Sequence, residues 1–142
     1  MYLTHNIFYM FIFSFIVNMF ILPLIISNSF KDITLNMNKV YLSIIVGLLV
    51  VISQVYSFDI LQQTRSKKDY IIYIFLLIVY IYLYRNQMFV DDKNFLKDIK
   101  EKNSASLLIS ASTKTKNPRI KSFSNYINNT LEKQIGFINK II

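Results

Sequence analysis

The stretch Tyr70–Tyr84, YIIYIFLLIVYIYLY, constrains the fold more than any other part of the chain. It contains no charge, no Gly and no Pro, and tyrosine is its only polar residue type. As a helix it reaches about 22 Å, short of the roughly 30 Å hydrocarbon core of a bilayer, and extension to Val90 brings it to about 31 Å. Tyrosines at both ends suit the two water–lipid interfaces, and Arg85 can extend its charge toward the headgroups. We therefore expect a membrane helix near residues 69–88.

An earlier apolar run, Ile7–Ser27, is long enough to span a bilayer with modest tilt and is interrupted only by Asn18 and Pro23. A cleaved signal peptide is the competing interpretation. The run is too long for an ordinary signal h-region, no basic n-region precedes it, and no clear small-x-small cleavage site follows. We expect a retained membrane helix near residues 6–27.

Between these two runs lies Val40–Phe58, which is also apolar. Its Ser43 and Gly47 stand four residues apart, a spacing that lets a neighbouring helix approach closely. A third membrane helix is therefore predicted near residues 40–58. The composition agrees, because 54% hydrophobic residues combined with 16 Lys+Arg against 8 Asp+Glu is typical of a small membrane protein with charged parts outside the bilayer.

The remaining residues, 91–142, show two helical patterns. Asp91 or Asp92 can cap the first helix, a polar break follows at residues 112–116, and Asn117-Pro118 is a strong start signal for the second. The second helix carries an apolar stripe with steps of three and four residues: Ile120, Phe123, Ile127, Leu131, Ile135, Ile138 and Ile142. The predicted fold is all-α, with a three-helix membrane region over residues 1–90 and an antiparallel helical hairpin over residues 91–142.

A family resemblance rests on several short segments in a consistent order. The segments Arg85–Asp98 and Lys116–Lys121, together with the positions of the three apolar runs, resemble membrane-anchored members of the domain-of-unknown-function family numbered 305. That family includes CopM-like periplasmic copper-binding proteins and has a ferritin-like helical domain. The likeness covers nearly the whole chain. It implies that the hairpin is of ferritin-like type.

The metal ligands implied by this resemblance are missing. Where such proteins have an adjacent His pair on the first tail helix, this chain has Lys102 and Asn103. A Met position of that helix is Ile109, and the pattern of the last helix becomes Leu131, Gln134 and Ile138. A protonated ammonium cannot bind a metal, and a single amide is a weak ligand. The resemblance therefore implies a retained scaffold with a lost metal site, and we expect no metal and no cofactor.

The side of the membrane is not decided by charge alone. The cluster Arg65, Lys67 and Lys68 favours a cytoplasmic loop, whereas the basic residues that follow the last membrane helix argue for the reverse. The envelope role implied by the resemblance, taken with this cluster, predicts an N-terminus inside and a tail on the outer side. The excess of basic residues favours contact with anionic lipid headgroups, and nucleic-acid binding is not expected.

Catalysis is not expected either. The sequence offers no nucleophile–base pair, no zinc-ligand spacing and no phosphate-binding Gly loop. Two hypotheses remain: a non-catalytic membrane protein whose hairpin associates with itself or with a partner, and an envelope metal-handling protein with ligands supplied in trans or by unrecognised residues. A lone hairpin of this length buries too little apolar surface to be stable, so we expect a homo-oligomer or docking on an unknown membrane subunit, with Leu131 and Ile135 near the centre of contact.

Overall fold

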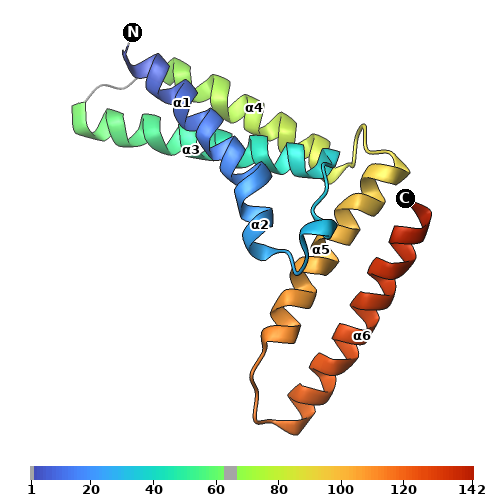
Figure 1. Ribbon diagram of the computed structural model, residues 1–142. Coiled ribbons are helices and arrows are strands. Elements are labelled where there is room, and N and C mark those ends of the chain that lie inside the picture. Colours follow the sequence, from blue (N-terminus) through green and yellow to red (C-terminus); the bar gives the residue numbers. More distant parts are fainter. Residues whose placement is uncertain (1, 63–66) are drawn as a thin grey trace. The chain divides into compact units, whose positions relative to one another are not determined.

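The computed structural model describes residues 2–62 and 67–142, with side chains described for residues 6–61 and 70–142. Its described regular structure is helical throughout, which confirms the predicted all-α class. In chain order the elements are α1 (Tyr2–Ile16), the π-helical η1 (Val17–Ile21), α2 (Leu22–Ile26), the 3₁₀ turn η2 (Phe30–Asp32), α3 (Met37–Gln62), α4 (Lys67–Arg85), α5 (Asp92–Ser112) and α6 (Pro118–Ile141), as labelled in Figure 1.

These elements form two compact units. The first comprises Met1–Ile21 and Met37–Phe89, and the second comprises Leu22–Asn36 and Val90–Ile142. The predicted division placed residues 22–36 in the membrane region, whereas their contacts group them with the hairpin. The connection between the first two apolar runs thus forms part of the tail's own structure.

In the first unit, α1 packs along α3, and α3 packs along α4. Ile7, Val51 and Val55 are its buried apolar centre, and Phe11, Tyr70 and Tyr73 pack against them. All three helices thus contribute aliphatic or aromatic side chains to this core.

The small residues of α3 serve the contact with α1 and η1. Ser43 is fully buried and accepts a hydrogen bond of 3.1 Å from Nδ2 of Asn18. A Cβ atom on Gly47 would lie 2.7 Å from Cε2 of Phe11. The spacing of Ser43 and Gly47 therefore does what the sequence predicted, since it admits a neighbouring helix at close range.

Two described helical stretches, Asn6–Ile26 and Met37–Leu61, are long and apolar enough to cross a membrane. The third predicted span does not meet this criterion, because the apolar part of α4, Tyr70–Arg85, measures only about 24 Å as a helix. The helix ends at Arg85 rather than continuing to Val90.

The backbone after Arg85 explains this early end. Gln87 and Phe89 adopt positive φ angles of 51° and 60°, in the left-handed region that stops a helix. The N–H of Met88 donates to the carbonyl of Leu83 at 3.0 Å, which closes the last turn. The predicted extension over residues 86–90 is therefore wrong.

In the second unit, α5 and α6 form the predicted antiparallel hairpin, coloured yellow to red in Figure 1. The side chain of Asp91 caps α5 by accepting from the N–H of Asn94 at 2.7 Å. Asn117 caps α6 by accepting from the N–H of Arg119 at 3.0 Å, and Pro118 is the first helical residue. These local signals confirm the predicted starts of both helices.

Candidate association surface

Part of the predicted association stripe is used inside the hairpin. Ile135 and Ile138 are 8% and 4% exposed, and α6 makes its extensive contacts with α5, where Leu107 is also buried. Ile127 and Leu131 are half-buried. The hairpin therefore has a small apolar core of its own, centred on the C-terminal half of α6.

The rest of the stripe faces solvent. Ile120, Phe123 and Ile142 are 49%, 64% and 45% exposed. The seven stripe residues thus do not share one free surface, because their middle members pack against α5 and their end members do not.

Polar contacts hold α6 against α5 along its length. The Ser124 hydroxyl donates to the Ser110 carbonyl at 2.7 Å, and the Ser110 hydroxyl donates to Oδ1 of Asn128. Nearer the C-terminus, Nδ2 of Asn103 donates to Oε1 of Gln134 at 2.9 Å. From one pair to the next the residue numbers rise on α6 and fall on α5, as an antiparallel hairpin requires.

The two former ligand positions implied by the resemblance have separate partners. Asn103 reaches across to Gln134, another position that the resemblance singled out. Lys102 instead turns back along its own helix, where its Nζ lies 2.6 Å from Oδ2 of Asp98. The structure thus brings together Asn103 and Gln134, and it directs Lys102 into an ion pair.

Six large apolar side chains, each at least half exposed, define what we call the open face of the hairpin. They are Phe95 and Ile109 of α5 and Phe123, Tyr126, Phe137 and Ile141 of α6. On α6 their spacing follows whole helical turns, and the fourteen-residue separation of Phe95 and Ile109 is close to four turns. Of these six, the sequence analysis included only Phe123 in the association stripe.

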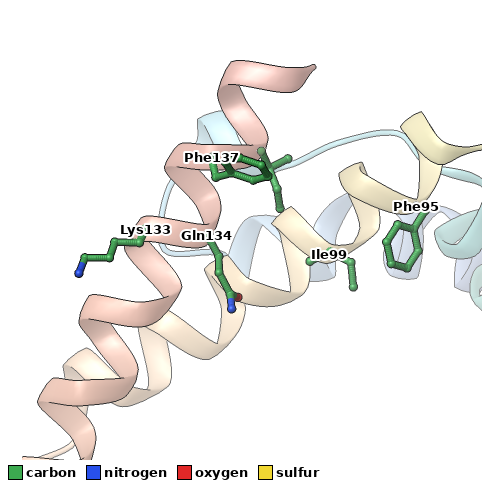
Figure 2. Close-up of a pocket in the computed structure, with 6 residues that line it drawn as sticks. Phe95, Ile99, Lys133, Gln134 and Phe137 are labelled. Carbon is green, nitrogen blue, oxygen red and sulfur yellow. The ribbon is translucent and has the colours of Figure 1, made fainter.

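A shallow groove of about 570 Å³ lies between the two helices on this face. Phe95 and Ile99 line it from α5, and Phe137, Ile138 and Gln134 line it from α6. Figure 2 shows Gln134 reaching toward α5, while Lys133 at the rim points away from it. The groove is therefore apolar at its base, with one cation at its edge.

The other side of α5 is covered by the connection of residues 27–36. Ser104, which is fully buried, donates to Oδ2 of Asp32 at 2.8 Å and accepts from the N–H of Asn28 at 3.0 Å. Nζ of Lys100 lies 3.6 Å from Oδ1 of Asp32 and donates to the Lys31 carbonyl at 2.9 Å. We call these residues the loop clamp.

Thr34 makes two further hydrogen bonds to α5, which also belong to the loop clamp. The Thr34 N–H donates to Oε2 of Glu101 at 3.0 Å, and the Thr34 hydroxyl donates to the Lys97 carbonyl at 3.1 Å. The loop clamp is not visible in the sequence, because the residues that it joins are more than sixty positions apart in the chain and no local pattern links them.

The carboxyl group at the start of α5 has a shifted pKa. Hydrogen bonds from the backbone and the side chain of Asn94 lower the pKa of the Asp91 carboxyl below its ordinary value. This is the behaviour of an N-cap carboxylate. Among the described residues, no group of three or more His, Cys, Asp or Glu side chains is placed to hold a metal ion.

No family model matches the chain, and no solved structure matches it. The chain is similar to an uncharacterized protein of Acanthamoeba polyphaga mimivirus, with 29% identity over 119 residues, covering 82% of this chain and 77% of that one. Because this similarity is longer than either compact unit, it includes parts of both. The resemblance to the family numbered 305 stays a prediction.

Proposed function

We propose that this chain is a non-catalytic integral membrane protein whose helical hairpin works by association, with a second copy or with another partner. The observation that carries the proposal is the open face, where six large apolar side chains are 50–71% exposed. Large apolar side chains gathered on one exposed face are unfavourable in water and are typical of an interaction site. The proposal therefore assigns the hairpin a binding role.

Three membrane crossings belong to the same proposal, and the loop clamp supports them. The connection of residues 27–36 joins the candidate spans Asn6–Ile26 and Met37–Leu61. If Met37–Leu61 crosses the bilayer, the chain after it emerges on the opposite side. Yet α5 is hydrogen-bonded to the connection, through Ser104 to Asp32 and through Glu101 to Thr34. The chain must return to that side, and α4 is the helix available to carry it back.

The length of α4 is compatible with this crossing. Its 19 residues, Lys67–Arg85, measure about 28 Å as a helix, close to the thickness of the hydrocarbon core. A small mismatch is met by local thinning of the bilayer and by extension of Arg85 toward the headgroups. The hairpin and the connection then lie on one side, and the chain between α3 and α4 lies on the other.

The outer placement of the tail also remains part of the proposal. It rests on the basic cluster between α3 and α4, of which Arg65 lies outside the described residues and Lys67 and Lys68 have no described side chains. Basic residues in a short loop favour the cytoplasmic side.

Within the hairpin, the exposed apolar residues differ from the contact centre that the sequence predicted. The expected centre included Ile135, which is buried against α5. Ile120, Phe123 and Ile142 remain available from the predicted stripe, and Phe137 and Tyr126 lie beside them on α6. Association through exposed residues therefore involves Phe123 and Phe137 more directly than Ile135.

Site-specific labelling tests the proposal, because the chain contains no Cys and an introduced thiol is unique. Tyr126→Cys and Ile141→Cys place it on the open face, and Asn139→Cys places it on an exposed part of α6 away from that face. In native membranes we expect a water-soluble maleimide to label the two open-face sites much more slowly than Asn139→Cys. Equal rates at all three sites would show that nothing covers the open face, and the proposal would be wrong.

A further inference from the structure

A line of basic residues runs along the edge of the open face. Arg119, Lys133 and Lys140 are exposed and share a seven-residue spacing with Tyr126, so the four lie near one line along α6. Phe123, Phe137 and Ile141 of the open face lie directly beside this line in the helical register. The acidic residue of α6, Glu132, is one position from Lys133 and therefore about 100° away around the helix.

The opposing helix adds another cation to this surface, and its exposed carboxylates, Asp91 and Asp92, stand at its start. On α5, Lys102 is exposed beside Phe95 and Ile109, and its ion pair with Asp98 accounts for a nearby carboxylate. The open face therefore combines large apolar side chains with positive charge, both along one margin and at Lys102 between Phe95 and Ile109. A partner that fits it must offer both an apolar layer and negative charge.

A second copy of the hairpin meets these requirements poorly. Two open faces placed together would bring each basic line close to the other or to the partner's Lys102, and the exposed carboxylates of the hairpin, Asp91, Asp92 and Glu132, are fewer than its exposed cations. Like charges brought together in this way disfavour association. The surface of a bilayer that contains anionic lipids provides apolar depth for Phe137 and phosphate charge for the lysines.

Chain connectivity keeps the hairpin near such a surface. The connection that the loop clamp binds to α5 is continuous with the candidate spans on both of its sides. Tyrosine is well suited to the water–lipid boundary, where its ring meets the acyl region and its hydroxyl meets water, and Tyr126 stands within the basic line.

We infer that the open face of the hairpin lies on an anionic lipid surface, with Phe123, Phe137 and Ile141 in the interface and Arg119, Lys133 and Lys140 against the phosphates. This inference rests on the proposed association role and names its partner. It makes α6 an interfacial helix that is attached to a membrane-spanning unit.

The test uses the full-length protein at one copy per nanodisc, which removes self-association. An environment-sensitive fluorophore is attached at Tyr126→Cys or Ile141→Cys, with Asn139→Cys as the matched control on the same helix. The bilayer is phosphatidylcholine, with or without phosphatidylglycerol. We expect a blue-shifted signal at the two open-face sites in the anionic bilayer only, reversed by high salt because screening weakens surface charge.

Charge variants show whether the basic line is responsible. Lys133→Gln and Lys140→Gln should each lower the docking equilibrium constant roughly fivefold, the effect expected for one lysine near an anionic surface. Lys121→Gln is the matched control, because it removes the same charge from an exposed position on the other side of α6. Equal effects of Lys133→Gln and Lys121→Gln would overturn the assignment of the basic line.

The remaining outcomes separate this inference from the proposed function. Protection from maleimide in native membranes without a fluorescence shift in anionic nanodiscs would overturn the lipid inference and leave the association role standing. A shift that appears only with two copies per disc would identify a second copy as the partner and would also overturn it. A shift of equal size in neutral and anionic bilayers would exclude the anionic requirement.

Discussion

Replacement of Ser104 by Ala should detach the connection of residues 27–36 from α5. The Ser104 hydroxyl is fully buried, donates to Asp32 at 2.8 Å and accepts from the Asn28 N–H at 3.0 Å. Its removal leaves a backbone donor unsatisfied and takes one hydrogen bond from a buried carboxylate. Because Lys100 still faces Asp32, we expect a total cost of about 2–4 kcal/mol, dominated by these two lost contacts.

Hydrogen exchange of the full-length protein measures this cost. A loss of about 2–4 kcal/mol corresponds to exchange of the amides of residues 28–34 that is roughly 30- to 700-fold faster. Ser106→Ala is the control, because Ser106 is an exposed residue of the same helix and its replacement gives the same gain in helix propensity. If the connection exchanges equally fast in both variants, the loop clamp does not hold it on α5 and the topological argument for three crossings loses its support.

The remaining predictions concern the hairpin core, topology and metal. Ile138→Ala should destabilise the hairpin by about 2–5 kcal/mol because that side chain is buried. Phe137→Ala should change its stability by less than about 1 kcal/mol because that side chain is exposed. We therefore expect faster amide exchange in α6 of the Ile138→Ala variant alone. Single cysteines at Leu35 and Lys114 should react with an impermeant reagent from the same side of the membrane, and a cysteine at Lys67 from the other; reaction of all three from one side would exclude three crossings. The tail should retain no stoichiometric copper or zinc after dialysis, as measured by elemental analysis, and retention would favour the metal-handling hypothesis.

Local signals predicted the hairpin well. Asp91 caps α5, and Asn117 with Pro118 begins α6, because a helix start is decided by residues within a few positions of each other. The contact of α1 with α3 through Ser43 and Gly47 was likewise visible as a spacing on one helix. In each case the physical cause lies within one turn or on one helical face.

Features that depend on distant parts of the chain were not predictable in this way. Periodicity identified the apolar stripe of α6, but it could not say that Ile135 and Ile138 would be covered by α5 while Phe123 stayed exposed. The end of α4 was misjudged because positive φ angles at Gln87 and Phe89 are unusual for these residue types. The loop clamp joins Asp32 to Ser104, and no pattern within either segment indicates this pairing.

Lys102 and Asn103 stand where the resemblance implies a pair of metal-binding histidines, and each makes a contact that needs no metal. A metal site at these positions would tie α5 to α6 through shared ligands. In this chain Asn103 makes that connection directly, by a neutral hydrogen bond of 2.9 Å to Gln134, and it needs no ion. Lys102 adds positive charge to the open face while its ion pair with Asp98 holds the side chain along α5. A hairpin built in this way is held together by its own side chains, and under the lipid inference the exposed Lys102 adds to the positive charge that favours an anionic surface.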